Sequence, residues 1–225
     1  MKPVPSNSPN KPVQIFCFGA SSVYGVGTIH GSWADLIKQR INQDLYGNKT
    51  GEKIEVFNLG ISGEKSDQLK RRIEQEIIAR EAFHSDWRKL IVISIGTNDS
   101  RAQGRKDAFV CNLDEFRDTA TRIIESAQKF SSDIIGVGLT PVDNSKTQPM
   151  AGKETYFDSK RIEQFESAYQ KVCEDQGVAF LENYGPASKL NWSKEYLYDD
   201  GLHSNDKAHQ WIFSRLWPMI SPILN

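Results

Sequence analysis

Short apolar runs alternate with longer amphipathic stretches along the chain, and this alternation is the strongest constraint on its fold. The runs are too short for buried helices and are bounded by turn residues, which is typical of strands inside a parallel sheet. Five of them occur, at residues 15–18, 54–59, 90–95, 134–139 and 178–181. The stretches between them repeat apolar residues at helical spacing. The pattern therefore predicts an α/β fold in which one parallel sheet carries helices on both faces.

Capping signals predict where several helices begin. In a capping box, a short polar side chain and an acidic side chain three residues later bond to each other's backbone N–H groups. The predicted cap residues are Ser32 with Asp35, Ser66, and Asn112 with Glu115.

Glycine and proline predict where elements end. We expect the helix after the first strand to end near Gly47, with Gly51 in the following turn. The last helix should start around Asn205 and break near Pro218. Pro141 follows the fourth strand and opens a loop of about fifteen residues, which is longer than most connections.

The bulk composition fits one ordinary domain. The chain has 225 residues, of which 38% are hydrophobic and 25% charged, with a net charge of -1. We expect a disordered lead-in at residues 1–13 and a single domain over residues 14–225. The lead-in lacks the apolar core of a signal peptide, no stretch is long enough for stable membrane insertion, and the charge balance argues against a nucleic-acid partner. Three separated cysteines without a C-x-x-C pair favour neither disulfides nor zinc, so we expect a cytoplasmic protein.

Small and polar residues follow the first three strands, at the sheet edge where parallel α/β proteins bind their ligands. Ser21 and Ser22 follow the first strand, so a nucleophile is available there. Gly60–Gly63 follows the second strand and Gly96–Asp99 the third. Backbone N–H groups at glycine and the amide of Asn98 can act as fixed donors to an oxyanion. Each loop taken alone also fits a structural role, in which glycine ends a strand and asparagine makes an Asx turn.

An acid–base pair stands near the C-terminal end of the chain. Asp200 precedes His203 by three residues, and in a turn this spacing brings the carboxylate onto the imidazole Nδ1–H. The other ring nitrogen is then free to accept a proton. Taken alone, the segment is better explained as a turn before the last helix.

Taken in order, these four segments resemble the sequence blocks of the SGNH, or GDSL-type, hydrolase superfamily. The matching stretches are residues 18–27, 58–64, 96–99 and 200–203. The resemblance extends from residue 14 to about residue 217. It implies a flavodoxin-like, three-layer α/β/α sandwich whose five-stranded parallel sheet has the order 2-1-3-4-5.

The resemblance also implies a role for each matched residue. Ser21 would be the nucleophile, His203 the general base and acid, and Asp200 the residue that orients His203. The backbone N–H groups of Ser21 and Gly63, with the side chain of Asn98, would form the oxyanion hole. Such a site requires no metal and no organic cofactor.

One position departs from the family pattern. Gly-Asp-Ser is usual in the first block, whereas this chain has Gly19-Ala20-Ser21. The missing carboxylate is not a member of the triad, so we expect an intact triad with a differently ordered nucleophile loop. The alignment of the block makes Ser21, rather than Ser22, the expected nucleophile.

The expected activity is serine-dependent hydrolysis of the ester bond of a small molecule, as in an esterase or lipase. Acyl thioesterase, lysophospholipase and carbohydrate acetylesterase chemistry stay open, as does a non-catalytic ligand-binding module on the same scaffold. A phosphate-binding first loop is a weaker alternative because the glycine pattern is incomplete. A metal site at His203, Asp206 and His209 is also weaker, because His209 falls on the predicted last helix. The sequence does not specify an oligomeric state.

Two groups of side chains bear on substrate choice. Basic residues in the loops after the third and fourth strands would attract an anionic ester or a phosphate-bearing head group, or would simply be solvated. They are Arg101, Arg105, Lys106, Lys146 and Lys153. Apolar side chains in these loops and before the last helix would line an acyl groove or pack internally. They are Phe109, Met150, Tyr156, Phe157, Trp192, Tyr196 and Tyr198.

Overall fold

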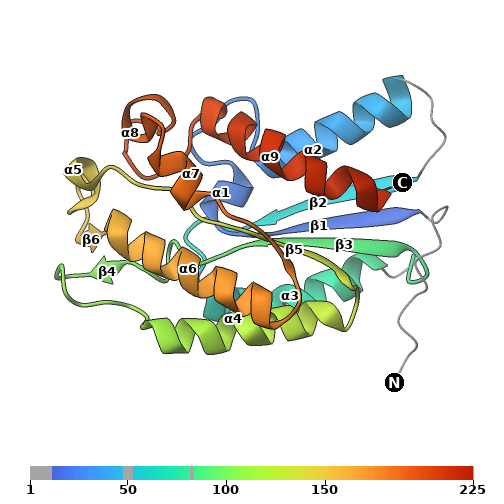
Figure 1. Cartoon of the computed structure of the whole chain (residues 1–225), viewed down its shortest axis with the longest axis horizontal. Helices are drawn as coiled ribbons and strands as arrows, with labels where there is room; N and C mark the ends of the chain where they lie inside the picture. Colours follow the sequence, from blue (N-terminus) through green and yellow to red (C-terminus); the bar gives the residue numbers. More distant parts are fainter. Residues whose placement is uncertain (1–11, 48–52, 82–83, 225) are drawn as a thin grey trace.

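Five parallel strands form the central sheet of the computed structural model, which describes residues 12–47, 53–81 and 84–224. They are β1 (Val13–Gly19), β2 (Ile54–Gly60), β3 (Arg88–Ser94), β5 (Asp133–Val137) and β7 (Ala179–Leu181). Their order across the sheet is β2-β1-β3-β5-β7, which is 2-1-3-4-5 when these five strands alone are numbered. The predicted α/β class and strand order are therefore confirmed (Figure 1).

Helices cover both faces of this sheet and complete the three layers (Figure 1). The first face carries α3 (Ser66–Glu81), α4 (Leu113–Gln128) and α6 (Ser159–Asp175). The opposite face carries α2 (Trp33–Asn42) and α9 (Asp206–Leu224). Because side chains alternate along a strand, β1 supplies Phe16 and Phe18 to the first core and Ile15 and Cys17 to the second.

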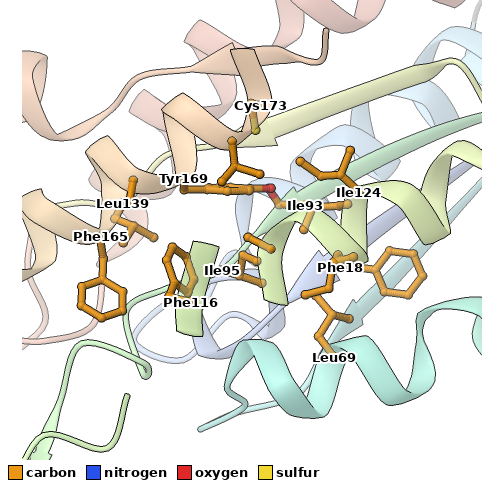
Figure 2. Packing of buried hydrophobic residues seen from close by; sticks show 14 of the residues in the cluster. Phe18, Leu69, Ile93, Ile95, Phe116, Ile124, Leu139, Phe165, Tyr169 and Cys173 are labelled. Atoms are coloured by element: carbon orange, nitrogen blue, oxygen red, sulfur yellow. The ribbon is translucent and has the colours of Figure 1, made fainter. Parts of the chain in front are cut away.

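The larger of the two cores lies under α3, α4 and α6 (Figure 2). Phe116 of α4 and Phe165 of α6 pack with their ring centroids 4.9 Å apart. Tyr169 is fully buried, and its hydroxyl donates a hydrogen bond of 3.1 Å to the carbonyl of Ile93 in β3. The Tyr169 hydroxyl therefore has a hydrogen-bond partner although it lies inside an apolar layer. Burial of the apolar side chains in this layer drives folding.

The connections at the carboxyl edge of the sheet contain short elements. They are α1 (Ser21–Tyr24), α5 (Asn144–Thr147), α7 (Tyr184–Ser188), α8 (Trp192–Glu195), and β4 (Ala102–Gln103) paired antiparallel with β6 (Thr155–Tyr156). The connection after Pro141, predicted as a plain loop, therefore contains α5 and β6. Its ribbon partner lies some fifty residues earlier in the chain, and elements this short leave no periodicity to detect.

The helix boundaries follow the predictions in part. Both predicted capping boxes are present, at Ser32 and at Asn112. Helical winding continues past α2 as a π-helical turn, Gln43–Gly47, up to the last described residue of this segment. The turn predicted at Gly51 lies outside the described residues. Residues 1–11 of the lead-in predicted for residues 1–13 also lie outside the described residues. Val13, its last residue, belongs to β1.

Two predictions about helix ends are wrong. Ser66 does not cap α3 from outside but is its first residue, and its own N–H donates to Asp99 from the loop after β3. The last helix does not break at Pro218, since α9 runs through both Pro218 and Pro222. Ile220 lies between these prolines and is fully buried against the sheet, so packing offsets the backbone hydrogen bonds that the prolines lack. No helix in the described ranges is both long and apolar enough to cross a bilayer.

Two adjacent isoleucines of α3 test this account of the core. Ile77 is fully buried, whereas 47% of Ile78 is exposed. We expect Ile77→Ala to lower the free energy of unfolding by about 2–5 kcal/mol, through lost burial and a cavity. The matched variant Ile78→Ala should cost less than about 1 kcal/mol. Urea denaturation measures both, and equal losses would contradict the assignment of the inner face of α3.

Candidate active site

The register of the sheet brings three loops to one edge. β1 pairs in parallel with β2 and β3, and Gly19 lies opposite Gly60 on one side and Ser94 on the other. The three strands therefore end level with one another. The residues that follow them, 20–24, 61–64 and 95–99, meet at the same edge, as the sequence predicts.

Ser21 is the first residue of α1, directly after a tight approach between strands. Gly19 has φ of +154°, and a Cβ at this position would lie 2.3 Å from the carbonyl oxygen of Ser94. Glycine is therefore required where β1 turns into α1. The carbonyl of Ala20 accepts hydrogen bonds from the N–H groups of Val23 (3.1 Å) and Tyr24 (2.9 Å). The N–H of Ser21 donates no hydrogen bond within the described chain and is left for a ligand.

The loop around Ser21 is held by Asn58 rather than by a side chain at position 20. Ala20 makes no side-chain capping bond. Asn58, near the end of β2, donates from Nδ2 to the carbonyl of Val23 at 2.8 Å and to Asp35 Oδ1 at 3.0 Å. Asp35 in turn belongs to the capping box of α2. The nucleophile loop is thus ordered through a neighbouring strand and helix.

His203 and Asp200 form the predicted pair. His203 Nδ1 lies 2.5 Å from Asp200 Oδ2. The other carboxylate oxygen, Oδ1, accepts hydrogen bonds from the N–H groups of Leu202 (2.9 Å) and His203 (3.0 Å). The carboxylate therefore fixes both the backbone turn and the ring orientation, so that His203 Nε2 is free on the opposite side.

The surroundings of Asp200 keep it ionised. Burial by itself raises the pKa of this carboxyl, but hydrogen bonds from the His203 ring and from the N–H groups of His203 and Leu202 outweigh burial and lower the pKa to about 2. At neutral pH the residue is thus an acceptor for the imidazole Nδ1–H.

Ser21 and His203 line the same small cavity. Its volume is about 40 Å³, and its apolar wall is formed mainly by Ile95, Leu139, Val142 and Leu202. Among the described residues, no hydrogen bond joins Ser21 Oγ to His203 Nε2. In enzymes with this arrangement, such a contact is often long until substrate binds.

Gly63 and Asn98 stand beside this cavity rather than in its wall. Asn98 is buried and donates from Nδ2 to the carbonyl of Glu64 at 3.1 Å, which ties the loops after β3 and β2 together. An amide nitrogen carries two hydrogens, so one remains for a ligand. Gly63 has φ of +81° and open space around its Cα, and its N–H donates to no group in the described chain. The predicted donors thus lie in adjacent, linked loops.

Two buried acids that the sequence analysis did not single out hold these loops. Glu64 forms an ion pair of 2.6 Å with Arg72 of α3. Asp99 accepts hydrogen bonds from the N–H (3.0 Å) and the hydroxyl (2.5 Å) of Ser66. Burial raises the pKa of Asp99 above its usual value, and the bonds from Ser66 oppose this rise. Both acids flank predicted donors in sequence, which is the signal that would have found them.

Two of the three residues in the alternative metal site, Asp206 and His209, make hydrogen bonds to backbone N–H groups instead. Asp206 Oδ1 accepts the N–H groups of Ile29 (3.1 Å) and His30 (3.0 Å). His209 is fully buried and accepts the N–H of Trp33 at Nδ1, and burial lowers its pKa to about 4. Within residues 12–47, 53–81 and 84–224, no group of three or more His, Cys, Asp or Glu side chains is arranged to hold a metal ion.

Comparisons with known proteins show the family of the chain and agree with its fold. Residues 17–211 match the model of the GDSL-like lipase/acylhydrolase family. The lipase/acylhydrolase from Enterococcus faecalis is 18% identical, with a TM-score of 0.73, over 94% of this chain and 97% of that one. Axe2, an acetylxylan esterase from Geobacillus stearothermophilus, is 19% identical, with a TM-score of 0.66, over 95% and 96%. TesA is 19% identical, with a TM-score of 0.64, over 94% and 99%. No curated protein sequence matches the chain.

The low pKa of Asp200 makes a prediction about acid stability. Because the folded state holds this pKa near 2 and the ordinary value is 3.8, the carboxylate stabilises the fold above about pH 4, and this contribution is lost as the pH falls toward 2. The difference in unfolding free energy between wild type and Asp200→Asn should therefore shrink across this range. Asp107→Asn, an exposed site, is the control, and a difference that stays constant down to pH 2 would contradict the assignment.

Proposed function

The chain belongs to the GDSL-like lipase/acylhydrolase family, and from this premise we propose that it hydrolyses carboxylic esters through an acyl-enzyme on Ser21. The observation that carries the proposal is the contact of 2.5 Å between His203 Nδ1 and Asp200 Oδ2, with His203 and Ser21 lining one cavity. An oriented imidazole beside a serine at a strand end is the arrangement that activates a hydroxyl for nucleophilic attack.

The first half-reaction transfers the acyl group to the enzyme. His203 Nε2 accepts the proton of Ser21 Oγ as the oxygen attacks the ester carbonyl, and Asp200 stabilises the imidazolium that forms. The N–H groups of Ser21 and Gly63 and the Asn98 amide donate to the oxyanion of the tetrahedral intermediate. His203 then protonates the leaving alcohol, and the acyl group stays on Ser21.

The second half-reaction releases the acid. His203 removes a proton from a water molecule that attacks the acyl carbonyl, the same donors hold the second oxyanion, and Ser21 leaves with its proton restored by His203. The unused donors favour this proposal over a non-catalytic binding module. A module has no need of a half-buried acid that orients a histidine lining the same cavity as a serine.

We infer further that the acyl group is short. A single water requires about 10–15 Å³ by the measure used for small cavities, so about 40 Å³ beside Ser21 accommodates a few heavy atoms. Leu139 and Val142 line the cavity and are both buried. This favours acetyl esters, including those of acetylated carbohydrates, over the long-chain esters that a lysophospholipase hydrolyses.

The nucleophile is tested by two neighbouring serines. Ser21 and Ser22 both line the cavity, so removal of either hydroxyl is a comparably small change. We expect Ser21→Ala to lower kcat for p-nitrophenyl acetate by at least about 10³-fold, whereas Ser22→Ala should stay within about fivefold of wild type. If Ser22→Ala loses activity while Ser21→Ala retains it, the assignment is reversed.

Acyl length is tested by enlarging the cavity. With wild type, kcat/KM should fall about tenfold or more from acetyl to butanoyl p-nitrophenyl esters, because each excess methylene has no space. Leu139→Ala should restore most of the butanoyl activity relative to acetyl, with Val142→Ala as a milder second variant. Leu190→Ala, at an exposed leucine that does not line the cavity, is the control. A wild-type profile that rises toward octanoyl would contradict a short acyl group.

A further inference from the structure

A second cavity lies between the β4–β6 ribbon and the start of α6. Its volume is about 250 Å³, and it shares no lining residue with the cavity beside Ser21. Three cationic side chains line it, Lys106, Lys160 and Arg161, together with the rings of Phe109 and Tyr156 and the carboxylate of Asp158. The family assignment and the ester chemistry leave this cavity without a role.

Arg161 is fixed in the wall of this cavity. Its Nε donates to the carbonyl of Ser100 at 2.9 Å and its Nη2 to the carbonyl of Cys111 at 2.8 Å. The guanidinium carbon lies 3.6 Å from the centroid of the Phe109 ring, a cation–π contact. Its Nη1 has no hydrogen-bond partner within the described ranges. The group is thus held in place by two carbonyls and a ring, and within the described ranges its guanidinium forms no direct ion pair.

Two lysines add to the positive charge. Within the part of the chain that the structure describes, neither Lys106 nor Lys160 forms an ion pair. Asp158, the acid in the wall, accepts hydrogen bonds from three neutral donors, Gln148 Nε2 (2.7 Å), Asn144 Nδ2 (3.3 Å) and the N–H of Arg161 (3.0 Å), which orient its carboxylate but leave its charge. Three cations and one carboxylate therefore line the cavity, which leaves an excess of positive charge.

Two other basic residues of these loops contact groups outside the cavity. Arg105 pairs with Asp107 at 3.1 Å, and Lys146 donates to the carbonyl of Asp199 at 3.1 Å. Of the loop residues named for their charge in the sequence analysis, Lys106 is the one that lines this cavity. The cavity thus draws its positive charge from Lys106 of these loops and from Lys160 and Arg161 of α6.

We propose that this cavity binds an organic anion, a small molecule that carries a phosphate or carboxylate group. Like charges gathered in one concave site repel one another, and an anion between them removes that repulsion and supplies acceptors for their N–H groups. Phe109 and Tyr156 provide apolar walls for the carbon skeleton attached to the anion. The proposal concerns a second site and does not depend on the chemistry at Ser21.

The binding test uses phenyl phosphate as the probe and isothermal titration calorimetry at low ionic strength. Wild type should bind it saturably and should bind phenol at least tenfold more weakly. The double variant Lys106→Gln/Lys160→Gln should raise Kd at least tenfold. The matched control, Lys38→Gln/Lys70→Gln, removes the same charge from α2 and α3 and should change Kd less than twofold. Equal weakening in both double variants, or no saturable binding to wild type, would overturn the proposal.

Kinetics then identify the source of the anion. If phenyl phosphate raises KM for p-nitrophenyl acetate, the cavity takes the distal end of an anionic substrate. If it binds without raising KM, the anion is a separate ligand. Either result supports the site if the Lys106→Gln/Lys160→Gln variant loses the corresponding effect, which is the rise in KM in the first case and the binding in the second. Because calorimetry needs no turnover, loss of esterase activity in Ser21→Ala leaves the binding result intact, so the two proposals fail independently.

Discussion

The parallel pairing of β1 with both of its neighbours is the constraint on which the site depends. β1 is buried along its whole length, and its register sets Gly19 level with Gly60 and Ser94. At Gly19 the backbones approach so closely that no side chain fits, since a Cβ there would lie 2.3 Å from Ser94 O. The chain must therefore turn at one fixed place, which places Ser21 beside the loops that hold Gly63 and Asn98.

Buried polar contacts convert this shared edge into a fixed arrangement. Asp99 binds the first residue of α3, Glu64 pairs with Arg72 of the same helix, and Asn98 joins the two loops through the Glu64 carbonyl. Removing one partner of a buried ion pair costs about 3–5 kcal/mol. The loops beside Ser21 are thus anchored to α3, a helix of the protein core.

The sequence predicts those features that repeat or stand close together in the chain. Short apolar runs between helical stretches specify the five strands, and the three-residue spacing of Asp200 and His203 together with the family resemblance indicates their pairing. Contacts between distant segments escape such reasoning, as with Asp99 and Ser66 or the β4–β6 ribbon. The break predicted at Pro218 fails for the same reason, because the burial of Ile220 is decided by the sheet beneath it and not by local propensity.

The central claim is that Ser21 becomes acylated, and covalent labelling tests it most directly. The full-length protein would be treated with a fluorophosphonate ester, digested and measured by peptide mass spectrometry. The account predicts one phosphonate adduct, on Ser21, that is absent from Ser21→Ala and strongly slowed in His203→Ala. An adduct on Ser22, or no adduct on a protein that hydrolyses esters, would contradict it.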